Sequence, residues 1–463
     1  MLLVALLAAQ VGPWWYPTPD GSMYLSTARS IAGRARLSAL GSAQLAYPPG
    51  YALLISPAFL TGERPFLAIS ALHFFLATLL LGGVYRWTSR WCSDAALLVT
   101  ALVMVHVSLW VHYRRTLSEL AFFTAFMWSV NLLDRVLAST SLRRALAAAA
   151  PASLLLALTC LIREAGIVLA AGFAAGVLRR SIHDQRGWAP GFLALAVIGA
   201  PALVGVAAFI SYDEHAKTAA FVPVGTHLDG LRAAAAVWPE QTIEGLRMRA
   251  SEIGRLVIPG MFKASGVRGH WLDINMAVYL PVVFALLTGW WRFARRHCEV
   301  LALTFPFYLA AYVLWPFDGG TRYLLPLLPL LFASVWMLLE PLPRYRLVVL
   351  ALLVGGHLDV AAGYWLAIDA PRARACDEQW AAVDTLAEQI RPGAAVAAAA
   401  GVPECVRLML EFALDRPVRT ATDGGHGGAN SEWLIMPRGN PRAGVVVRSG
   451  SAGYELLLRD SRS

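Results

Sequence analysis

Charged residues are scarce in this sequence. Asp, Glu, Lys and Arg make up 15% of its 463 residues, whereas a soluble domain carries about 25%. Hydrophobic residues make up 57%, and the mean hydropathy is +0.56. The composition therefore indicates an integral membrane protein. Its net charge of +9 comes mostly from arginine in short clusters between apolar runs, which is typical of membrane-protein loops and does not indicate a nucleic-acid partner.

Several local patterns are also missing. There is no paired histidine spacing such as H-x-x-x-H, no glycine-rich phosphate-binding pattern next to a predicted strand in the C-terminal part, and no clear internal repeat. Residues 1–10 are apolar but lack the basic segment and the A-x-A site of a cleavable signal peptide. They are short for a span, which needs about 20 residues. We therefore expect the first helix to begin upstream or to be shortened by the choice of start site.

Apolar runs of suitable length predict a mainly α-helical, polytopic bundle of about eleven spans over 1–369. Two long stretches, 13–64 and 211–273, are too polar to cross. Within the first, 23–31 predicts a helix along the membrane surface and 51–60 an interfacial or re-entrant piece; small helices are expected in the second. Besides the N-terminal helix, the predicted spans are 66–86, 95–112, 118–134, 146–162, 165–179, 190–210, 274–291, 299–316, 322–339 and 347–368.

Arginine clusters fall in alternate loops between these spans. Under the positive-inside rule such loops face the cytoplasm. Asp20, both long stretches and the C-terminal part then lie on the outer face. The clusters are Arg86 and Arg90; Arg135, Arg143 and Arg144; Arg179, Arg180 and Arg186; Arg292, Arg295 and Arg296; and Arg344 and Arg346.

The composition changes after about residue 370. Residues 379–390 and 404–414 predict helices, and short runs with β-branched residues predict strands. We expect a small extracytoplasmic α/β domain over 370–463. The sequence gives Cys376 and Cys405 as the one plausible disulfide, because the topology leaves only these two of five cysteines on the oxidising side. The predicted strands are 394–400, 417–420, 432–436, 444–448 and 454–459.

Asp20 is the residue that most needs an explanation, because it is an acidic group at the expected mouth of the bundle. Asp is a favoured helix N-cap, so Asp20 either caps a helix beginning at Gly21 or Ser22 or serves as a catalytic base, and one position can do both. Further ionisable residues gather on the same predicted face. Arginine snorkelling at the interface is the alternative for each one, but their gathering favours a shared anionic site. They are Arg114, Arg115, Glu119, Arg163, Glu164, Asp318 and Arg322.

Five stretches together resemble the GT-C glycosyltransferases, in particular the bacterial branch that is similar to dolichyl-phosphate-mannose-protein mannosyltransferases and related to the lipid A aminoarabinose transferase. They lie in matching order between about 14 and 340. In this sequence Gly21 follows Asp20, where many members of the family have a second acidic residue. The stretches are Pro19-Asp20-Gly21-Ser22-Met23-Tyr24, Tyr47-Pro48-Pro49-Gly50-Tyr51, Arg115-Thr116-Leu117-Ser118-Glu119, Leu161-Ile162-Arg163-Glu164 and Thr321-Arg322-Tyr323-Leu324-Leu325-Pro326.

The resemblance implies an inverting transfer of a sugar from a polyprenyl-phosphate donor to an acceptor hydroxyl of a lipid, glycan or protein. It would take place at the outer face of a bacterial cytoplasmic membrane. Asp20 would be the base, and Glu119 would orient the acceptor or, with Asp20, hold a divalent metal ion, a point that the residues leave open. Arg163 and Arg322 would bind the donor phosphate, and Arg115 is a weaker choice for the same role. Tyr24 and Tyr47 would line the sugar pocket, and the alternative for each tyrosine is an aromatic residue at the membrane interface.

Two other classes of function fit a polytopic bundle with arginines on one face. One is a transporter or flippase of lipid-linked glycan intermediates, although such proteins often show internal repeats and broken helices at mid-membrane. The other is an inactive relative that acts as an assembly partner through its outer domain. A transfer activity that depends on Asp20 would separate the enzyme from both.

Overall fold

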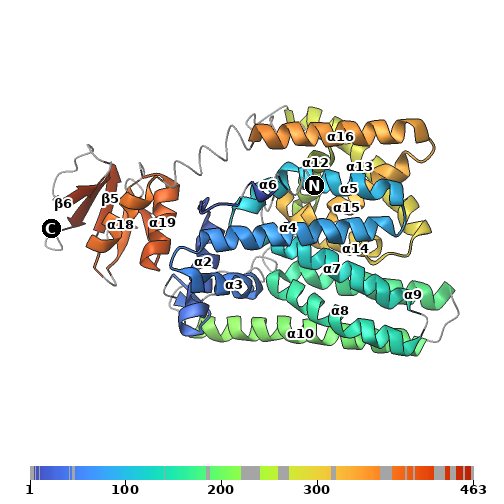
Figure 1. The fold of residues 1–463 in the computed structure, drawn as a ribbon, viewed down its shortest axis with the longest axis horizontal. Helices are drawn as coiled ribbons and strands as arrows, with labels where there is room; N and C mark the ends of the chain where they lie inside the picture. Colours follow the sequence, from blue (N-terminus) through green and yellow to red (C-terminus); the bar gives the residue numbers. More distant parts are fainter. Residues whose placement is uncertain are drawn as a thin grey trace.

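The computed structural model describes residues 5, 7–9, 11–40, 42–43, 47–139, 141–183, 188–219, 240–258, 271–313, 320–364, 378–391, 394–399, 402–421, 433–437, 445–451 and 454–459. Long helices pack side by side over most of the first 364 residues, and a smaller α/β unit follows at one end (Figure 1). The helices of the bundle are α4 (Phe66–Ser89), α5 (Ser93–Val105), α6 (Val107–Arg114), α7 (Glu119–Ala138), α8 (Leu142–Ile162), α9 (Val168–His183), α10 (Trp188–Ala219), α12 (Glu240–Val257), α13 (Trp271–Arg296), α14 (Val300–Val313), α15 (Leu328–Leu338) and α16 (Pro343–Tyr364).

Each span predicted after residue 65 coincides with helix, so the mainly α-helical, polytopic bundle is confirmed. In the described part of the chain, six helical segments are long and apolar enough to cross a membrane, and α5 with α6 makes a seventh if this pair is one span. The count of eleven is not confirmed. The helices α10 and α14 contain only shorter apolar segments, and most of residues 1–10 lie outside the described residues.

The predicted single span 95–112 is in fact two helices bent by 54°. The break is at His106, whose backbone is extended (φ −65°, ψ 124°). Its ring nitrogen Nδ1 accepts a hydrogen bond from the amide of Ser108, so the side chain caps the new helix α6. Hydropathy does not reveal such a cap. The His106 ring binds an amide at the start of α6 that would otherwise lack a partner within the helix, and one histidine hardly lowers the mean hydropathy of the run.

The first long loop folds into short elements that pack against the end of the bundle. They are α2 (Pro19–Arg34), the hairpin β1 (Ser38–Ala39) and β2 (Ser42–Ala43), α3 (Gly50–Ile55) and the 3₁₀ helix η1 (Ser56–Thr61). The helix α2 begins earlier than predicted, since Thr18 is its N-cap and accepts from the amide of Gly21 at 3.0 Å. The alternative that Asp20 is the N-cap is therefore wrong: Pro19 takes the first helical position, where its fixed φ and missing N–H fit, and Asp20 follows in the first turn.

The second long stretch begins later than expected, because α10 continues to Ala219. The predicted helix in this stretch is present as α12. Residues 220–239 and 259–270 lie outside the described residues. One face of α12 is buried, including Arg249 and Glu252, and packs against α13, α14 and the 3₁₀ helix η4 (Gly320–Leu327).

The helix ends that border the five arginine-rich loops meet at one end of the bundle; residues 184–187, which belong to the third of these loops, lie outside the described residues. Arg90 forms ion pairs with Asp134 and Glu299, and Arg296 forms one with Glu340. Two arginines of α9 donate to carbonyls of α7 and α13: Arg180 to Leu137, and Arg179 to Ala294 and Arg295. Because α7 has 20 residues, its length of about 30 Å separates this end from the end that carries Glu119 and α2.

The C-terminal unit has the predicted α/β character. It contains two helices, α18 (Trp380–Gln389) and α19 (Glu404–Leu414), and a five-stranded sheet in the order β4-β3-β5-β7-β6. The first three strands of that order are parallel and the others antiparallel. Residues 365–377 lie outside the described residues, so the domain boundary at 369/370 and the pairing of Cys376 with Cys405 stay predictions. The strands are β3 (Val396–Ala399), β4 (Val418–Ala421), β5 (Trp433–Pro437), β6 (Val445–Ser451) and β7 (Tyr454–Arg459).

Candidate active site

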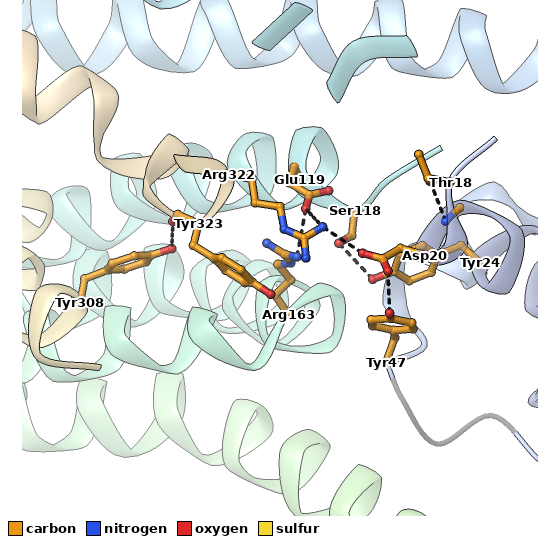
Figure 2. A network of polar contacts seen from close by, with 11 residues as sticks. Thr18, Asp20, Tyr24, Tyr47, Ser118, Glu119, Arg163, Tyr308, Arg322 and Tyr323 are labelled. Atoms are coloured by element: carbon orange, nitrogen blue, oxygen red, sulfur yellow. Dashed lines mark hydrogen bonds and ion pairs between the residues drawn. The ribbon is translucent and has the colours of Figure 1, made fainter. Parts of the chain in front are cut away.

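Asp20 lies at the N-terminal end of α2 and faces the end of the bundle. Its Oδ1 accepts a hydrogen bond from the hydroxyl of Tyr47 at 2.7 Å, and its Oδ2 accepts one from Nη1 of Arg322 at 2.9 Å (Figure 2). The Asp20 side chain keeps 23% of its surface exposed. The positive end of the α2 dipole also favours a carboxylate in the first turn. Asp20 is thus a reachable carboxyl group with a fixed orientation.

Glu119 is the buried counterpart of Asp20. It begins α7, and only 2% of its side chain is exposed. Its Oε1 accepts a hydrogen bond from Nη2 of Arg163 at 3.1 Å and lies 3.7 Å from Nη1 of Arg322. A buried carboxylate needs such partners, because an unpaired charge is expensive to remove from water. Although burial opposes the charged form of Arg163, the Glu119 carboxylate holds the pKa of this arginine above its usual range.

Arg322 therefore lies between two carboxylates, one partly exposed and one buried (Figure 2). Both arginines also lie over the ring of Tyr323, with guanidinium carbons 4.5 Å (Arg163) and 5.2 Å (Arg322) from its centroid. The ring can hold the two like charges near each other through its negative face. The hydroxyl of Tyr308 donates to the Tyr323 carbonyl and helps to fix η4.

The two predicted pocket tyrosines lie beside Asp20 but differ in role. Tyr24 is buried, donates to Oγ of Ser118 at 3.1 Å, and packs against the rings of Tyr47 and Tyr51 with centroids at 5.1 and 4.9 Å. Burial and the Asp20 charge raise the pKa of Tyr47 above its usual range. Tyr47 therefore keeps its proton and remains a hydrogen-bond donor to Asp20.

The Pro-Pro-Gly turn before α3 brings Tyr47 to this place. A Cβ atom on Gly50 would lie 2.6 Å from the carbonyl carbon and oxygen of Leu161 and 2.7 Å from the amide nitrogen of Ile162. Only glycine permits this approach, which sets the start of α3 against the end of α8, directly before Arg163.

Six of the seven predicted site residues are thus together: Asp20, Tyr24, Tyr47, Glu119, Arg163 and Arg322. Arg115 is placed differently. Its Nη2 donates to the hydroxyl of Tyr364 at 3.1 Å, and its guanidinium lies 4.8 Å from the ring centroid of Tyr16. Of the other ionisable residues on this predicted face, Asp318 and the side chain of Arg114 lie outside the described part of the structure.

Sequence reasoning missed Tyr323, Ser118 and His112. Tyr323 and Ser118 directly neighbour Arg322 and Glu119, so their presence in the same short stretches was the available signal. His112 is 7% exposed, and its Nδ1 has no hydrogen-bond partner among the described residues. His112 falls inside the predicted span 95–112, so hydropathy does not single it out as a site residue.

Asp20 and Glu119, the pair that could hold a metal ion, both contact the guanidinium of Arg322. No group of three or more His, Cys, Asp or Glu residues in the described ranges could hold a metal ion. The positive charge beside Asp20 is supplied by arginine.

Comparisons with known proteins identify the fold. No protein-family model matches the sequence, and no curated protein is significantly similar to it. ArnT from Cupriavidus metallidurans bound to undecaprenyl phosphate has a similar structure, with a TM-score of 0.57 and 11% identity over 100% of this chain and 98% of that one. The same protein in the apo state gives 0.55 and 12% identity over 98% and 97%. The apo oligosaccharyltransferase of Archaeoglobus fulgidus gives 0.52 and 13% identity over 94% of this chain and 69% of that one. The chain therefore has the fold of the GT-C superfamily of glycosyltransferases.

Proposed function

We propose that this protein is a membrane glycosyltransferase that moves a sugar from a polyprenyl-phosphate donor to an acceptor hydroxyl. The observation that carries the proposal is the set of Asp20, Arg322 and Arg163, an accessible carboxylate with two arginines at one end of a GT-C bundle. The similar structure of ArnT contains undecaprenyl phosphate, which supports a lipid phosphate as the donor's carrier.

In the proposed reaction, the acceptor oxygen attacks the anomeric carbon of the donor sugar while Asp20 takes the hydroxyl proton. The bond between the anomeric carbon and the phosphate oxygen breaks, and its electron pair stays on the lipid phosphate. Arg163 and Arg322 stabilise the charge that develops there. A single displacement with one base inverts the configuration of the sugar.

Arg322 connects donor binding to the base. Its Nη1 donates to Oδ2 of Asp20 at 2.9 Å. A phosphate that draws Arg322 away leaves this oxygen free to accept the proton, while Tyr47 continues to orient the carboxylate through Oδ1. Glu119, almost fully buried, serves in this proposal as the fixed counter-ion of both arginines, without touching the acceptor.

We place the reaction at the outer face of a bacterial cytoplasmic membrane. The support is that the helix ends that border the five arginine-rich loops meet at the end of the bundle that is remote from Asp20, and such loops are retained in the cytoplasm. The acceptor is a lipid, glycan or protein hydroxyl that reaches the membrane surface beside α2.

The test is a transfer assay with purified protein in nanodiscs and a panel of radiolabelled polyprenyl-phosphate sugars. Asp20→Asn removes the base and keeps the size of the side chain, so we expect transfer to fall about a hundredfold to ten-thousandfold with donor binding retained. Melting temperature controls for folding. Full transfer by Asp20→Asn would remove Asp20 as the base. Binding of a donor without turnover by the wild-type protein would instead favour the flippase or the inactive assembly partner.

A further inference from the structure

The C-terminal unit contacts α2, the helix that carries Asp20. Ser26 of α2 is fully buried, and its hydroxyl donates to Oδ1 of Asp415, the C-cap of α19, at 2.5 Å. One turn further along α2, Nη2 of Arg29 donates to the carbonyl of Phe412 at 2.6 Å, and its guanidinium lies 3.9 Å from the Phe412 ring centroid. A cation at the last turn of a helix satisfies a carbonyl that has no partner within the helix, and it is attracted by the negative end of the helix dipole.

An aromatic cluster extends this contact to the bundle. Trp380 of α18 and Phe412 of α19 pack against Trp15 and Phe66, with ring centroids between 5.3 and 6.3 Å apart. The face of Trp380 is covered by Arg64, which also pairs with Asp384 of α18. The interface thus joins α18 and α19 to the two ends of the first long loop, whose helices α2 and α3 lie between the bundle and the C-terminal unit in Figure 1.

Strained backbone is concentrated at the same place. Among the described residues, three that are not glycine have positive φ: Ala35 (51°), Leu40 (50°) and Asp415 (50°). Ala35 ends α2, and the amide of Leu40 donates to the Ser26 hydroxyl at 2.7 Å, the same hydroxyl that bonds Asp415. Left-handed conformations of this kind persist where the surroundings over-determine them, and they cluster at functional sites.

We propose that the C-terminal α/β unit is a positioning element of the active site: by docking on Ser26 and Arg29 it fixes the axial position and rotation of α2, and with them the place of Asp20. This inference rests on the proposed function. Asp20 is on α2, whereas Arg163 and Arg322 are on the bundle. The base and the phosphate-binding groups therefore keep their relative geometry only while α2 is held, and a misplacement of about 1 Å can lower a rate about a hundredfold.

The test compares Ser26→Ala and Arg29→Ala with Thr27→Val in the full-length protein. Thr27 is a matched control, because it is equally buried in α2 but its hydroxyl bonds the Met23 carbonyl of its own helix. We expect the two docking variants to lower kcat about tenfold or more. Their affinity for sugar-free undecaprenyl phosphate should stay within about twofold of wild type, because the arginines are not on α2, and Thr27→Val should stay near wild type in both.

Hydrogen exchange of the α2 amides gives a second readout that needs no turnover. Faster exchange in the first turn of α2 is expected in Ser26→Ala and Arg29→Ala but not in Thr27→Val. Wild-type kcat in both docking variants, or unchanged exchange, would overturn the positioning role, as would a loss of phosphate affinity that matches the loss of kcat. A wild-type protein that turns over no donor would count against the proposed function alone, and the exchange measurement would still decide the role of the C-terminal unit.

Discussion

Arg322 contacts two carboxylates with different exposure, and this makes it the most informative single residue of the site. Its own side chain is 30% exposed, so its removal does not leave a large cavity. Arg163 is a poorer choice, because removing one partner of a buried ion pair costs about 3–5 kcal/mol and would affect folding.

We predict that Arg322→Ala weakens binding of undecaprenyl phosphate about tenfold to a hundredfold, the effect of losing hydrogen bonds to a charged group worth about 1.5–3 kcal/mol. Isothermal titration or a fluorescence assay in nanodiscs measures it. Arg115→Ala is the matched control: its described contacts are with Tyr364 and Tyr16, so we expect less than about a threefold change. Equal effects of the two variants would show that Arg322 has no special place at the phosphate.

The hydroxyl of Tyr47 is predicted to orient the base without taking part in proton transfer. Tyr47→Phe removes the hydrogen bond to Oδ1 of Asp20 and keeps the ring contact with Tyr24. We expect kcat to fall about tenfold, the kinetic equivalent of one hydrogen bond to a charged group, with phosphate affinity unchanged. A loss as large as that of Asp20→Asn would mean that the hydroxyl itself handles the proton.

The sequence was sufficient to name most of the residues that meet at the site, because acidic and basic groups are rare in apolar segments and therefore conspicuous. It was not sufficient to pair them. Which of two carboxylates is buried depends on how α7 packs, and the link from Asp20 to Arg322 joins residues 302 positions apart. The N-cap of α2 was also not predictable with certainty from the sequence. Thr18 and Asp20 are both good N-caps, and the choice between them depends on Pro19 taking the first helical position.

At the scale of elements, the contact between α3 and α8 sets the segment that follows Tyr47 against the end of α8, directly before Arg163. We predict that Gly50→Ala lowers both the melting temperature and kcat, because the added methyl group would lie 2.6 Å from the Leu161 backbone and would push the two helices apart. Thermal unfolding and the transfer assay measure the two effects.

Gly33→Ala is the control for this prediction. It also replaces a helical glycine, but nothing lies within 4 Å of the new Cβ atom, so we expect a neutral or slightly stabilising change. Equal melting temperatures for the two variants would contradict the close approach at Gly50.

Helices were predictable wherever an apolar run was long, as for α4, α7 and α8. Interruptions of the helices were not predictable from hydropathy, because the bend at His106 depends on a side-chain cap inside a mostly apolar run. The strands of the C-terminal unit were located from β-branched residues, but their order was not, because β3 pairs with β4 and β5 across intervening segments.

At the scale of the whole molecule, the arrangement of the arginine-rich loops predicts the orientation in the membrane. In a cysteine-free variant that retains activity, a cysteine at exposed Thr61, the last residue of η1, should react with a membrane-impermeant maleimide in intact cells whose outer barrier has been opened. A cysteine at exposed Ser93, beside Arg90, should react only after the cytoplasmic membrane is permeabilised. The reverse pattern would place the site in the cytoplasm.

The contact between Ser26 and Asp415 spans 389 positions of the chain, and this separation has a consequence for biosynthesis. At roughly 5–20 residues per second, a ribosome needs about 20–80 seconds to travel that distance. The helices of the bundle are made within this interval, and the surface of α2 on which α19 docks stays uncovered until its end. A chain that ends between the bundle and α19 thus contains Arg163 and Arg322 but lacks the contacts of Ser26 and Arg29 that we propose to hold α2 in place.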